Sequence, residues 1–239
     1  MTSRPAATLA QRKRQLVADE LTRAALDLLA GGGFDAVTVD EIATAAGVSK
    51  RTFFRYFASK EDVVVQFLAA LGTAMREELA ARPAQETPSV ALRHAVWRCV
   101  EDCAGHEERA RRVVRLILTT PALLARFLER QAQWRDELAA QLARRLGLDA
   151  ARELYPRLAA DMALAAFHTV LQRWSTADAA AGNGEGVGSG EGADDGEGAG
   201  GDGGGVDIAV LTENCFAVIA PALDAVVRTP APGGARATA

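Results

Sequence analysis

The chain has 239 residues, 49% hydrophobic and 24% charged, enough to bury a substantial core in one large or two smaller domains. Runs of about eighteen uninterrupted apolar residues are absent, and the N-terminus lacks the apolar stretch of a secretory signal, which excludes a membrane-spanning segment and a leader. The net charge is −4, and three cysteines, an odd number, favour a reducing compartment, so a soluble cytoplasmic protein is expected.

The N-terminal quarter of the chain has a positive net charge, whereas the remainder has a negative one. Residues 1–60 hold nine basic and six acidic side chains, whereas the remainder holds eighteen and twenty-five. Residues 1–10 are predicted to form a disordered arm, and residues 11–30 a helix that ends at three glycines. Its apolar face carries Val17, Leu21, Ala25 and Leu28. The basic residues before this face, Arg12, Lys13 and Arg14, either contact a DNA backbone or face solvent.

Residues 34–61 have the pattern of two very short helices joined by a tight turn. Thr38 followed three residues later by Glu41 is a capping box, which predicts a first helix over 39–46. Gly47 then supplies the stop and the turn.

The second short helix is predicted to begin after Ser49, which can cap it. Its opening residues are donors that can reach guanine edges and phosphate oxygens: Lys50, Arg51 and Thr52. Its other face is apolar and must be buried: Val48, Phe53 and Phe57. This layout is typical of a helix-turn-helix DNA reader; the alternative is a helical hairpin whose charges only face water.

Caps, prolines and helical spacing predict six further helices, which makes the fold all-α with about nine helices. The predicted ranges are 60–81, 88–104, 107–118, 121–145, 150–176 and 206–228. Before the last helix, residues 182–205 comprise thirteen glycines, six acidic residues and no basic or aromatic one. Such a composition predicts disorder, and its two Gly-x-Gly-x-x-Gly matches follow no strand, so they do not indicate a nucleotide site.

The N-terminal region closely resembles the DNA-binding domain of the tetracycline-repressor (TetR) family. The resemblance lies in Gly33-Phe34, in Thr-Val-Asp-Glu-Ile-Ala from Thr38, in Ala-Gly-Val-Ser, and in Phe-Phe-Arg-Tyr-Phe from Phe53. It implies an all-α homodimer that binds a palindromic DNA operator and releases it when a small-molecule effector enters the larger C-terminal domain.

The family resemblance also implies which residues bind DNA: Thr38, Val39, Ser49, Lys50, Arg51, Thr52, Arg55, Tyr56 and Lys60. Among them Lys50, Arg51 and Thr52 hold base-reading positions, and Lys60 a phosphate contact. Many members have Tyr at the position of Phe54, so one hydroxyl contact is missing here. The implied domains are a helix-turn-helix domain over 11–58, a ligand-binding and dimerisation domain over 59–229 with a disordered insert at 178–205, and a disordered tail over 230–239.

The region that follows Arg115 is similar to the C-terminal domain of an actinobacterial TetR subgroup that includes the mycofactocin-system regulator. For some of that subgroup an acyl-coenzyme A type of effector is implied. Aromatic and polar side chains on three predicted helices are candidates to line its pocket: Trp97, Phe127, Gln131, Trp134, Phe167 and His168. The alternative for each of them is a place in the core of a helical bundle.

Cys99, Cys103 and His106 share one face of a predicted helix, which makes a metal-responsive regulator an alternative, although buried cysteines commonly act as small hydrophobic residues. Neither a catalytic triad nor a phosphate-binding loop has plausible spacing, so no enzyme and no cofactor are expected. An architectural helical protein without operator recognition is the remaining alternative.

Two apolar seams on the last two predicted helices need a partner to cover them. They comprise Met162, Ala165, Ala166 and Thr169, and Val210, Cys215, Val218, Leu223 and Val226. Two recognition helices must also reach successive major grooves about 34–36 Å apart, which requires a dimer.

Overall fold

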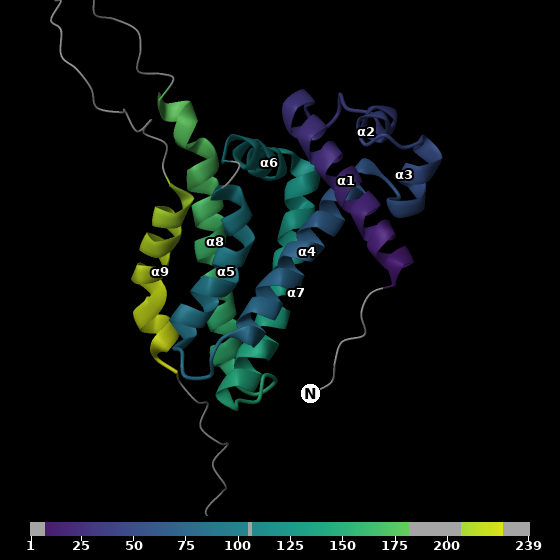
Figure 1. The fold of residues 1–239 in the computed structure, drawn as a ribbon. Coiled ribbons are helices and arrows are strands. Elements are labelled where there is room, and N and C mark those ends of the chain that lie inside the picture. Colours follow the sequence, from purple (N-terminus) through teal and green to yellow (C-terminus); the bar gives the residue numbers. More distant parts are fainter. Residues whose placement is uncertain (1–7, 105–106, 182–206, 227–239) are drawn as a thin grey trace, which may run out of the picture.

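The computed structural model describes residues 8–104, 107–181 and 207–226, and all regular structure in these ranges is α-helical (Figure 1). The helices are α1 (Leu9–Gly32), α2 (Val39–Ala45), α3 (Lys50–Tyr56), α4 (Lys60–Ala81), α5 (Pro88–Ala104), α6 (Glu107–Thr119), α7 (Pro121–Leu146), α8 (Leu154–Ala181) and α9 (Ile208–Asp224). The all-α prediction is confirmed. Within these ranges none of the helices is long and apolar enough to span a bilayer.

Side-chain caps set most of the helix starts. Thr38 and Glu41 form the predicted capping box, with the Thr38 amide donating to Glu41 Oε2 at 2.7 Å. Ser59 likewise caps α4 by accepting from the Asp62 amide at 3.1 Å. Gly47 and Gly147 both have a positive φ, near 65°, which a residue with a Cβ rarely adopts, and they end α2 and α7 where expected.

Several predicted boundaries need correction. The first helix starts at Leu9, not at residue 11, because Thr8 and Gln11 form another capping box, so residues 9 and 10 are not part of a disordered arm. Helix α8 starts at Leu154, since Asp149 holds residues 151–153 in a turn. It continues to Ala181, into the segment predicted as a disordered insert; the rest of that segment and the tail lie outside the described residues.

The last helix ends at Asp224, four residues before the predicted end, because its final turn is committed to other helices. The Asp224 carboxylate accepts from the amide and the hydroxyl of Ser89 at 2.9 and 2.8 Å, at the start of α5. The hydroxyl of Tyr155 donates to the Leu223 carbonyl, and burial together with the nearby Asp224 charge raises the pKa of Tyr155 to about 12. These contacts tie α9 to α5 and α8.

Helices α1–α3 form a small head at one side of the molecule, and α4–α9 form a larger body (Figure 1). The core of the head is made by the predicted apolar residues: Leu21, Ala25, Ile42, Phe53 and Phe57 are all buried. In the body, α4 packs against both α5 and α7, and α8 packs against both α7 and α9. Helix α6 lies between α1 of the head and α8 of the body, so head and body meet through α6 and through α4.

Helices α4 and α7 approach each other closely inside the body. Trp134 of α7 is 2% exposed, and its indole lies against the backbone of Gly72 in the middle of α4. A Cβ atom on Gly72 would overlap the indole ring. Gly72 is therefore required by contact between two helices and not by its backbone conformation.

Replacing Gly72 with Ala should destabilise the protein by about 1–3 kcal/mol, because the indole of Trp134 is a rigid, buried group that cannot swing away. The matched control is Gly31→Ala in α1, where an added Cβ meets nothing within 4 Å and the helix propensity of Ala should stabilise by about 0.5–1 kcal/mol. Urea denaturation measures both. Equal stability of the two variants would contradict the close packing of Trp134 on α4.

Candidate DNA interface and effector pocket

The recognition helix α3 is oriented by its own aromatic residues. Phe53 and Phe57 are buried in the head, with their ring centroids 5.7 Å apart. Burial of this face turns the opposite face outward, and Lys50, Arg51 and Arg55 are exposed there. Among the described residues Arg51 forms no ion pair, so its guanidinium is available to a ligand.

The other residues at the start of the two short helices already have partners within the head. Lys50 pairs with Asp40 of α2 at 2.7 Å, an exposed and therefore weak ion pair. The hydroxyl of Thr38 is engaged with Glu41. Ser49 caps α3 by accepting from the amide of Thr52 at 3.1 Å, and the two hydroxyls lie 3.0 Å apart. These residues form the scaffold that presents the exposed cations, and Val39, half-buried, packs against the core.

Tyr56 lies between two guanidinium groups. Arg55 is 5.2 Å from the centre of its ring, and Arg14 of α1 is 5.9 Å from it. Arg14 therefore stands beside the recognition helix although it is far from it in sequence. Phe54, which lacks the hydroxyl found in many relatives, is 50% exposed on the same helix.

Lys60 points into the head. Its ammonium donates to the carbonyl oxygens of Phe34 and Val37, the latter at 3.0 Å, and lies 4.6 Å from the centre of the Phe34 ring. Two of its three N–H donors are thus used to hold the loop before α2. A phosphate contact by Lys60 stays a prediction, and replacing this residue would also disturb the head.

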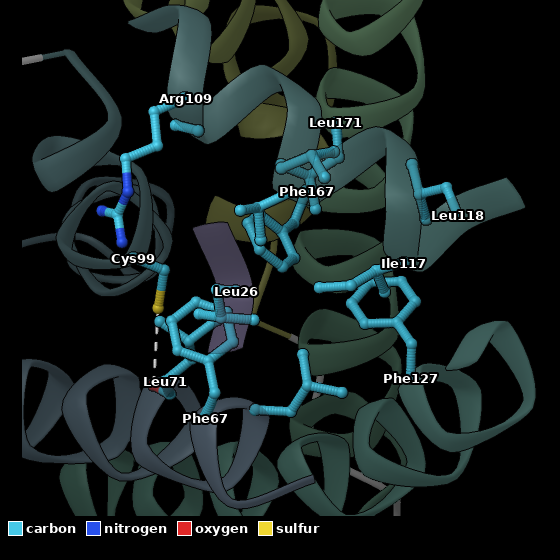
Figure 2. A pocket seen from close by; sticks show the side chains of 14 residues that line it. Leu26, Phe67, Leu71, Cys99, Arg109, Ile117, Leu118, Phe127, Phe167 and Leu171 are labelled. Atoms are coloured by element: carbon cyan, nitrogen blue, oxygen red, sulfur yellow. Dashed lines mark hydrogen bonds between the residues drawn. The ribbon is translucent and has the colours of Figure 1, made fainter. Parts of the chain in front are cut away.

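A largely apolar pocket lies where the head meets the body, with an empty volume of about 880 Å³ that includes its opening to solvent (Figure 2). Helix α1 contributes Leu26 to its wall, and α4 contributes Phe67, Leu68 and Leu71. Cys99, Phe127, Phe167 and Leu171 complete it from the body, and α6 lines one side with Arg109, Ala110, Val113, Val114, Ile117 and Leu118.

Only two of the six predicted pocket residues, Phe127 and Phe167, line this pocket. Trp134 and His168 lie behind Phe127, with ring centroids 5.9 and 5.4 Å from it. Trp134 on α7 is buried against Gly72 of α4, and His168 on α8 is half-buried, so both lie outside the lining of the pocket. Trp97 and Gln131 are half-buried and also lie outside the lining.

Two buried nitrogen atoms stand out in this aromatic cluster. Gln131 Nε2 and His168 Nε2 have no hydrogen-bond partner among the described residues. Burial lowers the pKa of His168, because the interior disfavours the charged imidazolium.

The sequence reasoning missed Arg109, Leu26 and most of the α6 lining. A signal was present in α6, where Val113, Val114 and Ile117 form an apolar stripe among arginines. The metal hypothesis finds no support in the described residues, where no group of three suitable ligands occurs. Cys99 donates from its thiol to the Leu71 carbonyl at 3.4 Å, whereas the Cys103 side chain and His106 lie outside the described residues.

An exposed cationic helix on a capped helix-turn-helix head, joined to a helical body with a pocket, defines a DNA-binding regulator. Comparison with known proteins agrees. The profile described as "Bacterial regulatory proteins, tetR family" matches residues 21–67, and that of the "MftR C-terminal domain" matches residues 86–182.

Relatives with the same organisation are regulators as well. The regulator TcmR of Streptomyces glaucescens is 36% identical over 174 residues, which cover 70% of this chain and 76% of TcmR. MftR of Mycobacterium tuberculosis, a mycofactocin biosynthesis regulator, is 33% identical over 136 residues, 57% of this chain and 69% of MftR. FadR of Thermus thermophilus, a TetR-family repressor solved with lauroyl-CoA, has a TM-score of 0.51 at 26% identity and covers 91% of this chain and 100% of its own.

The chain belongs to the TetR family of bacterial transcriptional regulators. Its relatives are transcriptional regulators, which confirms the expectation that the chain is not an enzyme. Regulators of the TetR family bind DNA and dimerise.

The half-buried imidazole of His168, whose Nε2 atom is buried, should make folding pH-dependent. Because its folded-state pKa lies below the ordinary value of 6.5, the stabilisation of the neutral ring is full above about pH 6.5 and is lost as the pH falls through the lower folded-state pKa. The melting temperature should therefore drop between pH 7 and about pH 5 in the natural protein, and drop less in His168→Leu. The control is His94→Leu on α5, which also removes an imidazole. If the melting temperature of His168→Leu depends on pH as that of the natural protein does, the argument from burial of His168 is contradicted.

Proposed function

We propose that the protein is a homodimeric repressor that binds a palindromic operator in the cytoplasm and releases it when a small molecule occupies the pocket between head and body. In this proposal α1–α3 form the DNA-binding domain, and α4–α9 form the ligand-binding and dimerisation domain. The observation that carries it is the face of α3 that exposes Arg51 and Arg55 while Phe53 anchors the opposite face in the core.

The expected DNA contacts follow from this geometry. Arg51 and Lys50 sit at the first turn of α3, where side chains of a recognition helix meet base edges. Arg55, Tyr56 and Arg14 form a cationic and aromatic group beside it, suited to the sugar-phosphate backbone. Thr38, Val39, Ser49 and Thr52 are proposed to contact DNA at its edges while they maintain the caps.

An apolar surface on α8 and α9 supports the dimer. Val218 is 81% exposed and Leu154 is 78% exposed, and Leu158 and Val210 are exposed as well. Of the seam predicted from sequence, Ala166 and Leu223 are buried inside the protomer and are not available to a partner. Exposed aliphatic side chains on neighbouring helices are typical of a surface that a second copy covers.

The chemistry of the pocket supports an amphipathic effector with an apolar chain. As formed by the described residues, its lining is aliphatic and aromatic apart from Arg109 and the Cys99 thiol. The Thermus thermophilus relative was solved with lauroyl-CoA, which fits this class. An acyl-coenzyme A type of effector is therefore our proposal for this chain too.

DNase footprinting of the purified protein on its own genomic region should reveal a short palindrome, and the effector should weaken that protection. No protected site would favour an architectural role and contradict the proposal.

Replacing Arg51 with Ala should weaken operator binding by about 1–3 kcal/mol and relax the base preference at one position in each half-site, because a base contact is lost. Arg144→Ala at the far end of α7 removes an exposed arginine from the body and should leave affinity unchanged. Fluorescence anisotropy with operator and random duplexes measures both. Equal losses on the two duplexes would assign Arg51 to backbone contacts only.

Replacing Val218 with Glu should produce a monomer, because a charge would be buried against a second copy. Operator affinity should fall with it, since one head reaches only one half-site. The control is Leu128→Glu, the same kind of change at a 47% exposed position on α7. Light scattering that finds both variants dimeric would place the dimer surface elsewhere.

A further inference from the structure

The pocket has a polar end and an apolar end. Among the described residues, Arg109 is the one charged member of the lining, and it lies at the opposite side of the cluster from Leu118 and Phe127 (Figure 2). Arg109 and Leu118 are nine residues apart on α6, a separation of about 13 Å along the helix. An elongated apolar molecule with an anionic group at one end matches this polarity.

Arg109 is already held by the DNA-binding head. Its Nε donates to the carboxylate of Asp27 on α1, and its Nη2 lies 3.5 Å from the carbonyl oxygen of Arg23. Leu26, the neighbour of Asp27, lines the pocket. The same turn of α1 therefore touches both the pocket wall and the arginine at its end.

We propose that Arg109 binds the anionic group of the effector and gives up Asp27 in exchange, so that the polar link between α6 and the head is broken when the pocket fills. This inference rests on the proposed effector-controlled function. It makes Arg109 the residue that selects an anionic head group, and the Arg109–Asp27 ion pair the contact that reports occupancy to the head.

The exchange costs Asp27 little and gives Arg109 a new anionic partner. The ion pair is partly exposed, with 39% of the Arg109 side chain and 36% of the Asp27 side chain accessible, so water screens it. Asp27 keeps a second cation when Arg109 leaves, because Arg23 lies 3.7 Å from its other carboxylate oxygen. An anion brought in by an apolar chain meets Arg109 beside aliphatic side chains, where a planar guanidinium can bind it through two hydrogen bonds.

The loss of this link would be felt by the head. Helix α1 meets the body through α6 and α4, and Arg109 with its Asp27 and Arg23 contacts is a polar connection across the α1–α6 junction. Effector binding can loosen the operator complex only if it differs between the two states of the protein. The exchange of Asp27 for the effector anion supplies that difference.

The head-group assignment is tested with three probes of the same chain: lauric acid, lauroyl-CoA and uncharged dodecanol. Binding is followed by the fluorescence of the tryptophans, of which Trp134 lies behind Phe127. Arg109→Gln should weaken the two anionic probes about tenfold and leave dodecanol within about twofold of the natural protein. Arg109→Lys keeps the charge and should restore part of the loss. Arg112→Gln, an exposed neighbour paired with Glu108, is the control and should change nothing.

The outcomes of these titrations separate the sources of the anion. If Arg109→Gln weakens the binding of both lauric acid and lauroyl-CoA, Arg109 binds either a carboxylate or a phosphate. If only lauroyl-CoA binds, and Arg109→Gln weakens it, Arg109 binds the coenzyme A phosphates. The assignment is overturned if all probes bind Arg109→Gln and the natural protein equally. It is also overturned if the natural protein binds neither lauric acid nor lauroyl-CoA.

The exchange itself is tested with Asp27→Asn, which keeps Arg109 free for the probe but removes its partner in the head. The anionic probe that binds more tightly should lower the affinity of the natural protein for the footprinted operator about tenfold. It should lower the operator affinity of Asp27→Asn by less than about threefold. Equal weakening of both overturns the exchange and leaves the repressor proposal intact. If footprinting finds no operator, the proposed function fails, while the probe titrations still decide the role of Arg109. Circular dichroism melting of each variant verifies that it is folded.

Discussion

The contact between Trp134 and the backbone of Gly72 fixes the distance between α4 and α7, and much of the molecule depends on that distance. Helix α4 begins directly after the recognition helix and carries at its start Lys60, which holds the loop before α2. Two to three turns later the same helix supplies the pocket wall, and α7 supplies Phe127 opposite to it. The absence of a side chain at Gly72 therefore sets both the width of the pocket and the position from which the head extends.

The pocket is shared by head and body, because Leu26 of α1 is part of its wall. A molecule in such a place touches the DNA-binding part directly, and no long chain of contacts is needed to carry its effect. The α1–α6 junction also includes a partly exposed ion pair, between Arg109 of α6 and Asp27 of α1. Junctions of this kind are suited to switching, since small changes in free energy shift them.

The features that could be predicted from the sequence are those that depend on residues close together along the chain. The capping box at Thr38 and the turn at Gly47 located the short helices within one residue, since their chemistry is complete within a few positions. The exposed and core-facing sides of α3 followed from the spacing of Phe53 and Phe57. The pocket did not follow, because Arg109 meets Asp27 from 82 residues away. Trp134 was a candidate for the pocket lining, but sequence spacing does not say that its face of α7 packs on Gly72 of α4.

The clamp between Ser89 and Asp224, formed across 135 residues of sequence, bears on the long glycine-rich connection before α9. With Arg93 pairing to Glu213 and Tyr155 bonded to Leu223, α9 is positioned by its neighbours along its whole length. Its location does not rely on the connection that leads into it. For a flexible connection, the entropic cost of closure rises by only about 0.6 kcal/mol for each doubling of its length. The number of residues between α8 and α9 can therefore change while the two helices stay packed against each other.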